Sequence, residues 1–115
     1  MSNFKKSKPE NVRITESYKI IKKYPERIPV IVEKSSRSKV KDIDKNKYLV
    51  PKDMTMGQFI YVVRKKINLD SSQALFLFVD NVLCNGSKVM ADVYNSYKDK
   101  DGFLYITYSS ENTFG

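Results

Sequence analysis

The side chains that perform most nucleophilic and metal-assisted catalysis are nearly absent from this chain. Its 115 residues include no histidine and a single cysteine, Cys84. Without an imidazole to take up its proton, Cys84 is a poor candidate nucleophile, and neither a histidine-based triad nor an HExxH zinc site can form. The four glycines are too dispersed for a loop that cradles phosphate. We therefore expect a protein that is not an enzyme and that uses no metal or other cofactor.

The terminal Gly115 is the residue whose chemistry is most suggestive. Glycine has no side chain to obstruct a narrow active site, so a carboxylate on a terminal glycine can be threaded into an enzyme and activated there. The preceding residues YSSENTF are mostly polar, which predicts a flexible tail over 109–115. A terminal glycine is weak evidence by itself, because some chains end in glycine by composition alone.

Positive charge is concentrated in the first third of the chain. Residues 1–41 hold 12 Lys and Arg against 4 Asp and Glu, whereas residues 42–115 hold 9 of each, so the whole net charge of +8 lies in the first segment. This asymmetry favours an acidic partner: nucleic acid, an anionic membrane or an acidic peptide. We expect no nucleic acid, because the stacking platforms of RNA-binding folds have no counterpart in the pattern.

Composition and length favour one domain with one hydrophobic core. The first eight residues are polar and basic and do not resemble a secretory signal. A single cysteine suits a reducing compartment. We expect a monomer in the cytoplasm.

The N-terminal third is expected to contain a basic arm, a helix and a strand. Residues 1–9 are predicted to be the arm. Residues 10–23 are predicted to be the helix, in which apolar residues recur at i, i+4 and i+7 and form one stripe: Ile14, Tyr18 and Ile21. Both faces of the predicted strand at 28–33 are apolar. The N-terminal helix is therefore expected to cover the face that carries Pro29 and Ile31.

Alternating strands and helices are predicted for the rest of the chain. A short strand at 47–51 ends at a proline, and Thr55 to Gln58 form a capping box that begins a helix. Later segments are a strand at 75–79, a helix at 88–97 and a strand at 103–108. This order predicts an α+β fold.

Five segments together carry a resemblance to a known family. They are KYPERIPVIVEK at 23–34, KYLVP at 47–51, MTMGQFIYVVRKKI at 54–67, ALFLFVDN at 74–81 and DKDGFLYITYSSENTFG at 99–115. In this order they resemble the GABARAP/light-chain-3 family of autophagy-related ubiquitin-like modifiers. The resemblance implies a ubiquitin-like β-grasp roll over 25–108 with one or two additional N-terminal helices. It divides the chain into an N-terminal basic arm and helical extension over 1–24, the roll, and a tail over 109–115.

The resemblance also implies a function that depends on the terminal glycine. A processing cysteine protease exposes the glycine, activating and conjugating enzymes carry it as a thioester, and it is joined to phosphatidylethanolamine. In this chain the conjugated residue would be Gly115, preceded by Phe114. The conjugate would mark autophagosomal membranes and recruit adaptors and cargo receptors that carry an aromatic-x-x-aliphatic motif.

Two pockets for this motif are implied beside the strand at 47–51. The first pocket set comprises Glu16, Ile20, Pro29, Ile31, Lys47, Leu49 and Phe103. The second pocket set comprises Tyr48, Val50, Pro51, Met54, Phe59 and Val62. Acidic residues that flank the motif would meet Arg27, Lys45, Arg64 and Lys66. From pattern alone, the apolar members of both sets are better explained as ordinary core, and only the resemblance favours pockets.

Phe76 and Phe78 share one face of the strand at 75–79, and the resemblance implies that they contact the processing protease. A second packed layer is the alternative for these two rings. For the whole protein, the alternative is a peptide-binding scaffold in membrane trafficking or on the cytoskeleton that is never conjugated.

Overall fold

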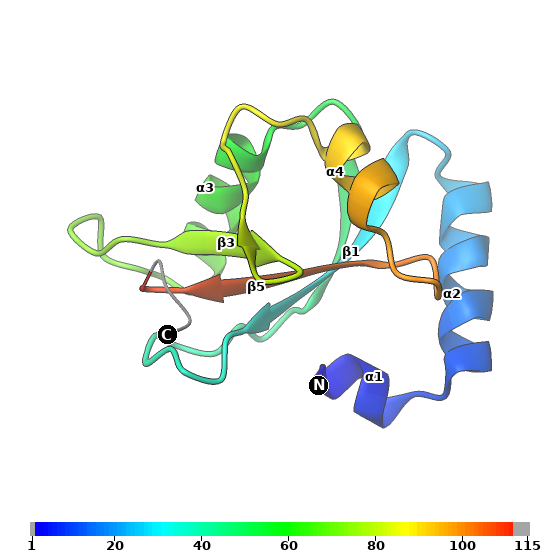
Figure 1. Ribbon diagram of the computed structural model, residues 1–115, viewed down its shortest axis with the longest axis horizontal. Coiled ribbons are helices and arrows are strands. Elements are labelled where there is room, and N and C mark those ends of the chain that lie inside the picture. Colours follow the sequence, from blue (N-terminus) through cyan, green and yellow to red (C-terminus); the bar gives the residue numbers. More distant parts are fainter. Residues whose placement is uncertain (1, 112–115) are drawn as a thin grey trace.

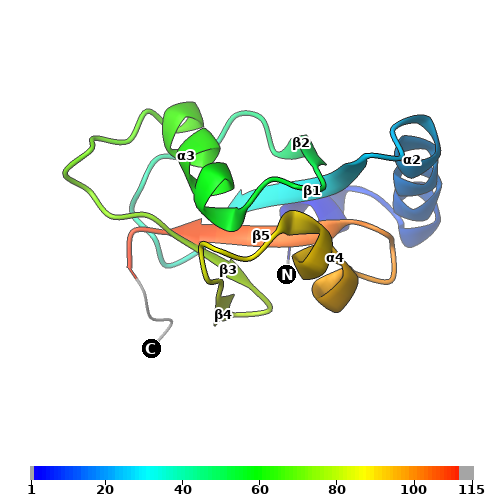
Figure 2. The ribbon, with the colours of Figure 1, turned by 90° about the horizontal axis from the view of Figure 1, so that it is seen from above.

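The computed structural model describes residues 2–111, which form one five-stranded mixed sheet with helices on both faces (Figures 1 and 2). The strand order is β2-β1-β5-β3-β4, and the central β1 and β5 run parallel. The strands are β1 (Arg27–Lys34), β2 (Lys47–Pro51), β3 (Phe76–Val79), β4 (Val82–Leu83) and β5 (Leu104–Ser109). The helices are α1 (Asn3–Ser7), α2 (Glu10–Lys23), α3 (Met56–Lys66) and α4 (Met90–Tyr97). The predicted α+β class is confirmed.

The main core lies between the sheet and the two helices α3 and α4. Alternate residues of β1, namely Ile28, Val30 and Val32, face these helices and are fully buried. The predicted capping box begins α3: the Thr55 hydroxyl accepts from the Gln58 N–H at 3.2 Å, and the Gln58 side chain accepts from the Thr55 N–H at 2.9 Å. No helix within residues 2–111 is both long and apolar enough to cross a membrane.

A second, smaller cluster lies on the opposite face of the sheet. Ile31 and Phe103 are fully buried there, with Ile20 of α2 packed against them. The expectation that both faces of β1 are covered is therefore confirmed, although α1 contributes to the cover as well as α2.

The prediction of a basic arm over residues 1–9 is wrong, because Asn3–Ser7 is helical. The Ser2 hydroxyl caps α1, and the Phe4 ring packs edge-on against Phe103 with the ring centroids 5.2 Å apart. The Phe4 N–H donates to the Glu33 carboxylate at 3.0 Å. A single apolar residue among polar ones gives no periodic signal, so α1 is stabilised by the face on which it docks.

The side of α2 that is buried also differs from the side that the sequence pattern predicts. The predicted stripe is exposed: Ile14 by 43%, Tyr18 by 56% and Ile21 by 38%. The buried residues of α2 are instead the polar Arg13 and Ser17. Burial of polar groups is tolerated when they are hydrogen-bonded, and both side chains find partners in the segment that precedes β5.

Asp101 is the main partner of these polar side chains. Its carboxylate is 1% exposed and accepts from the Arg13 Nε at 2.8 Å, from the Tyr105 hydroxyl and from the Phe103 N–H. The Ser17 hydroxyl donates to the Asp101 carbonyl at 2.5 Å. Burial and the neighbouring Asp101 carboxylate raise the pKa of Tyr105 well above its usual range, so the phenol stays a hydrogen-bond donor.

Gly102 lets this segment approach α2 closely. Its φ of +92° is a conformation that other residues rarely adopt, and a Cβ at this position would lie 2.3 Å from the Ser17 Oγ. The Gly102 carbonyl also accepts from the Tyr94 hydroxyl at 2.7 Å. Glycine is therefore required here for two independent reasons, the positive φ and the lack of space for a Cβ.

We expect Gly102→Ala to lower the free energy of unfolding by about 2 kcal/mol or more, because it adds backbone strain to a steric clash. Gly86→Ala is the matched control. A Cβ on Gly86 would lie 3.7 Å from its nearest neighbour, and the effect should be about 1 kcal/mol or less. Urea unfolding measures both variants, and equal losses would contradict the role assigned to Gly102.

Candidate functional site

The edge strand β2 presents unpaired backbone groups. It is paired on one side only, with β1, in a register that sets Leu49 opposite Pro29, which has no N–H. The Asn46 carbonyl accepts from the Val32 N–H at 2.7 Å, so the even-numbered positions form the hydrogen-bonded pairs. The backbone N–H and C=O groups of Lys47 and Leu49 therefore point away from the sheet.

Side chains of β2 alternate between the two faces of the sheet. Tyr48 and Val50 face α3 and are buried, whereas Lys47 and Leu49 face the side of α1 and α2 and are half-buried. An extended chain added at this edge would meet side chains of both faces.

The structure brings the first pocket set together on the α2 side of this edge. Ile31, Phe103 and Pro29 form its buried part, and the half-buried Ile20 packs on the first two. The half-buried Leu49 lies opposite Pro29 across the strand pair.

Two ion pairs and the Phe4 ring lie on the same side of the edge. The Glu16 carboxylate pairs with both Lys47 and Lys8, the latter at 3.1 Å. The ammonium groups of both lysines lie over the Phe4 ring, that of Lys8 at 5.2 Å and that of Lys47 at 5.6 Å from the ring centroid. Phe4 is therefore a residue of this site that the sequence reasoning missed, and its only signal was being the one aromatic residue in the predicted arm.

Most of the second pocket set belongs to the main core. Tyr48, Val50 and Phe59 are buried, and the Tyr48 and Phe59 rings meet edge-on with centroids 5.8 Å apart. Met54 and Val62 pack on this core and stay partly exposed. Pro51 differs from the others, because alternation along β2 puts it on the side of Lys47 and Leu49.

The four expected flank residues are placed differently from one another. Arg27 is exposed and donates to the outward carbonyl of Leu49 at 3.1 Å. The Lys45 ammonium lies 5.1 Å from the centroid of the Tyr48 ring. Arg64 donates to carbonyls of the loop after α3, that of Gln73 at 2.6 Å, and Lys66 is exposed. Arg27 and Lys45 are thus the two cations that contact β2.

The remaining candidates do not form part of this edge. Phe76 is half-buried and Phe78 is buried in β3, while Phe114 and Gly115 lie outside the described residues. Burial raises the pKa of the Cys84 thiol, which disfavours the reactive thiolate. Within residues 2–111, no three His, Cys, Asp or Glu side chains are grouped to hold a metal.

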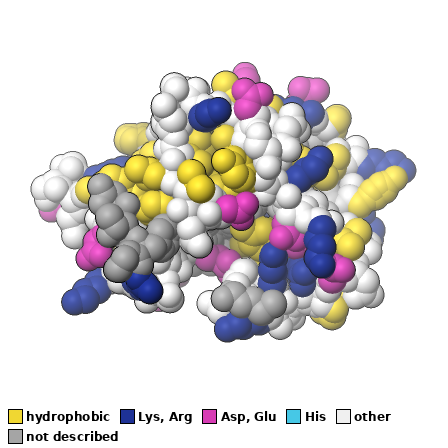
Figure 3. All heavy atoms as spheres, viewed as in Figure 1, with side chains coloured by type: hydrophobic (Ala, Val, Ile, Leu, Met, Phe, Trp, Pro, Cys, Tyr) yellow, Lys and Arg dark blue, Asp and Glu magenta, His cyan; other side chains and the backbone are white. Residues whose placement is uncertain are grey.

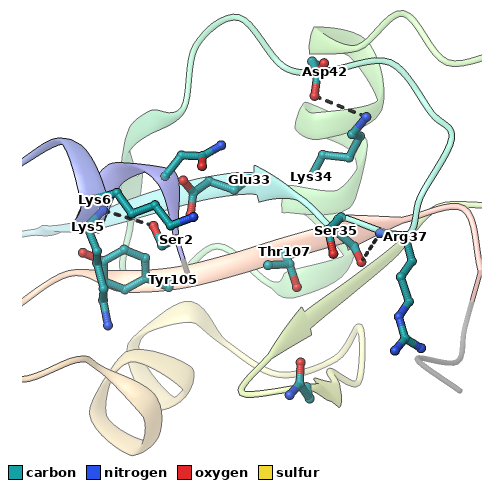
Figure 4. A pocket seen from close by; sticks show the side chains of 13 residues that line it. Ser2, Lys5, Lys6, Glu33, Lys34, Ser35, Arg37, Asp42, Tyr105 and Thr107 are labelled. Atoms are coloured by element: carbon teal, nitrogen blue, oxygen red, sulfur yellow. Dashed lines mark hydrogen bonds and ion pairs between the residues drawn. The ribbon is translucent and has the colours of Figure 1, made fainter.

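A basin of about 790 Å³ lies between α1 and the segment after β1, and none of the residues proposed for the site line it (Figure 4). Its charges are mixed: Lys34 pairs with Asp42 at 3.4 Å, and Glu33 is bonded to the backbone of α1. Lys6 and Arg37 reach it from opposite sides (Figure 4). The mixture of charges does not select one kind of ligand.

Known proteins resemble the whole of this chain. Residues 12–115 match the family model described as autophagy protein Atg8, ubiquitin like. Autophagy-related protein 8a of Arabidopsis thaliana is 58% identical over 114 residues, which cover 99% of this chain and 93% of that protein.

Two solved structures also share the fold of the whole chain. ATG8 of Trypanosoma brucei has a TM-score of 0.94 and 42% identity, and the match covers 100% of this chain and 99% of that one. Atg8 of Plasmodium falciparum, in complex with a Plasmodium falciparum Atg3 peptide, has a TM-score of 0.88 and 38% identity, with 96% and 98% covered.

We expect Tyr48→Phe to raise the free energy of unfolding by about 1 kcal/mol. The Tyr48 hydroxyl is buried without a hydrogen-bond partner among the described residues, and burial raises the pKa of Tyr48 to about 12. Tyr108→Phe is the control, because the Tyr108 hydroxyl donates to the Lys41 carbonyl at 2.7 Å. That variant should lose about 1 kcal/mol. Equal losses in thermal and urea unfolding would show that the Tyr48 hydroxyl is bonded.

Proposed function

Because the chain belongs to the Atg8 family of ubiquitin-like autophagy proteins, we propose that it is a modifier conjugated through Gly115 to phosphatidylethanolamine. We propose further that it recruits autophagy adaptors and cargo receptors by strand addition to β2. Its fold is the ubiquitin-like fold of that family, with the additional helices α1 and α2 at the N-terminus. In this proposal the protein is a substrate of enzymes and catalyses no reaction.

The outward backbone of β2 is the observation that carries the adaptor proposal. Lys47 offers its N–H and C=O groups and Leu49 its N–H group to an extended peptide, which can pair with them as a sixth strand, while the Leu49 carbonyl accepts from Arg27. In an extended peptide, residues i and i+3 point to opposite faces. An aromatic-x-x-aliphatic motif would therefore aim its two anchors at the two sides of β2, where the first and second pocket sets lie.

Charge supports an acidic flank on such a peptide. Arg27 and Lys45 lie beside β2, and the whole positive excess of the chain comes from residues 1–41. Exposed ion pairs contribute only about 0–1 kcal/mol each. Their main effect would be on the association rate and on the choice among motifs.

Conjugation requires partners beyond the adaptors. The Plasmodium falciparum relative binds an Atg3 peptide, which supports a conjugating enzyme among the partners of this chain. An activating enzyme and a processing cysteine protease complete the set, and the protease is proposed to contact β3 at Phe76 and Phe78. The free protein would be cytoplasmic, and the conjugate would lie on the autophagosome membrane.

Strand addition predicts a specific effect of proline at position 49. Leu49→Pro removes an N–H that points away from β1, so the β1–β2 pairing is retained while one hydrogen bond to the peptide is lost. Leu49→Ala is the control, because it removes the same side chain and keeps the N–H. Calorimetry with an acidic aromatic-x-x-aliphatic peptide should show binding weakened at least about tenfold more by proline than by alanine. Equal weakening would contradict pairing at Leu49.

The conjugation proposal is tested at the other end of the chain. In a reconstituted reaction with activating enzyme, conjugating enzyme and phosphatidylethanolamine vesicles, Gly115→Ala should abolish the lipid adduct seen by intact mass. The same preparation should bind the motif peptide with unchanged affinity, since position 115 is remote from β2 in sequence. Normal conjugation of the variant would refute the assignment of Gly115. An unmodified wild-type chain that still binds peptide would favour the non-conjugating scaffold.

A further inference from the structure

One apolar side of α2 is exposed to solvent over much of its surface. Ile14, Tyr18 and Ile21 recur at i, i+4 and i+7, so they lie along one side of the helix and form what we call the α2 stripe. Tyr18 is the most exposed of the three, and the Lys22 ammonium lies 5.8 Å from its ring centroid. Three large apolar side chains aligned on one helix are unusual for a surface that has no function.

The α2 stripe is separate from the proposed peptide edge. Glu16 and Ile20 of the first pocket set are each two residues from Tyr18, about 200° around the helix. A ligand that covers Ile14, Tyr18 and Ile21 alone would therefore leave Glu16 and Ile20 accessible.

Two hollows make the surface along the α2 stripe concave. One of about 440 Å³ is lined by the stripe together with Lys22, Lys100 and Gly102. A second of about 160 Å³ begins at Ile21 and continues over Pro29 and Tyr94. Ile21 lines both hollows, and we call the two together the groove. An extended peptide needs a strand edge with unpaired backbone groups, whereas the walls of this groove are side chains. Such walls can accept the side-chain ridge of a helix.

The groove is rimmed by positive charge. Lys22 and Lys100 line the first hollow, and Arg27 and Lys52 line the second. Its one acidic lining residue is the buried Asp101, whose charge is paired with Arg13. In the space-filling view, hydrophobic side chains reach the surface beside Lys and Arg at the α2 end of the molecule (Figure 3). The rim therefore favours an acidic partner.

The charge and the position of the groove exclude two other occupants. A second copy would set one lysine-rich rim against another, and three side chains are few for an interface that needs about 800 Å² per partner. As for a membrane, the helix α2 lies at the opposite end of the sheet from the Ser109 end of β5, which leads to the proposed lipid site (Figures 1 and 2). This last point rests on the proposed function.

We propose that the α2 stripe docks an amphipathic helix of a partner protein. The helix would lay an apolar ridge, spaced i, i+3 or i+4, and i+7, along Ile14, Tyr18 and Ile21. Asp or Glu residues beside the ridge would meet Lys22 and would compete for Lys100 with Glu10, which pairs with it at 3.1 Å. The protein would then bind two partners at once, an extended motif at β2 and a helix at α2.

The probe is a phage-displayed library of helical peptides of about 18 residues, randomised at ridge and flank positions. Selection on the full chain is followed by counter-selection on Tyr18→Lys. We expect acid-flanked clones with an apolar ridge, whose binding weakens at least about tenfold on Tyr18→Lys. Lys22→Glu should weaken them also, and Lys22→Arg should not. The matched control is Val12→Lys, which changes another exposed apolar residue (44%, against 56% for Tyr18) on the other side of α2 and should have no effect.

Four outcomes would overturn the proposal. Two concern the selected clones: that they bind wild type and Tyr18→Lys equally well, or that Val12→Lys weakens them as much as Tyr18→Lys does. The third is binding of the unconjugated chain to phosphatidylserine vesicles that is lost when Tyr18 is changed. The fourth is a dimer, seen in sedimentation equilibrium, that Tyr18→Lys dissociates. Clones must also bind the Leu49→Pro variant. That variant disables the β2 edge and leaves α2 unchanged. Loss of clone binding on Tyr18→Lys therefore tests the α2 proposal, and loss of motif-peptide binding on Leu49→Pro tests the proposed function separately.

Discussion

The buried ion pair between Arg13 and Asp101 is the contact on which both surfaces of this molecule depend. A charge removed from water costs several kcal/mol unless it is paired and hydrogen-bonded, and Asp101 is satisfied by Arg13, Tyr105 and the Phe103 backbone together. The pair fixes α2 at one position against the segment before β5. Without that position, Glu16 and Ile20 would not lie beside Ile31, and the α2 stripe would have no opposing wall.

The N-terminal 24 residues add little to the main core and much to the recognition surfaces. A helix as short as α1 is marginal by itself, and it is held by the Phe4 ring, the Glu33 carboxylate and an ion pair of Lys5 with Asp99 at 2.5 Å. Burial opposes the ionisation of Asp99, but Lys5 and the Asp101 N–H still hold the pKa of Asp99 below its usual value. The α1 contacts are therefore mostly polar, and they surround the first pocket set.

A single edge strand can recognise two side chains because a strand has two faces. In β2 the backbone that remains unpaired belongs to Lys47 and Leu49, and this follows from Pro29, which cannot donate across the register. The core residues Tyr48 and Val50 lie between these positions. In the proposed function, the outward backbone of the odd-numbered residues would pair with a peptide, while the buried even-numbered side chains stabilise the strand.

Local pattern in the sequence determined most of the elements. Periodicity and the Thr55–Gln58 capping box placed α2, β2 and α3 to within a residue or so of their ends, because spacing and end chemistry are local properties. The long matching segments indicated the family and its fold. They also supplied the two pocket sets, which composition and spacing alone could not separate from core.

Tertiary structure decided which surface of each element is buried. Apolar spacing in α2 indicated Ile14, Tyr18 and Ile21, yet the structure buries Arg13 and Ser17, whose partner Asp101 lies more than 80 residues away. The helix α1 forms around Phe4 for the same reason, since Ile31 and Phe103 are distant in sequence. Periodicity reports how apolar residues are spaced within a segment. It carries no information about a polar or aromatic partner elsewhere in the chain, and in α1 and α2 that partner outweighs the local pattern.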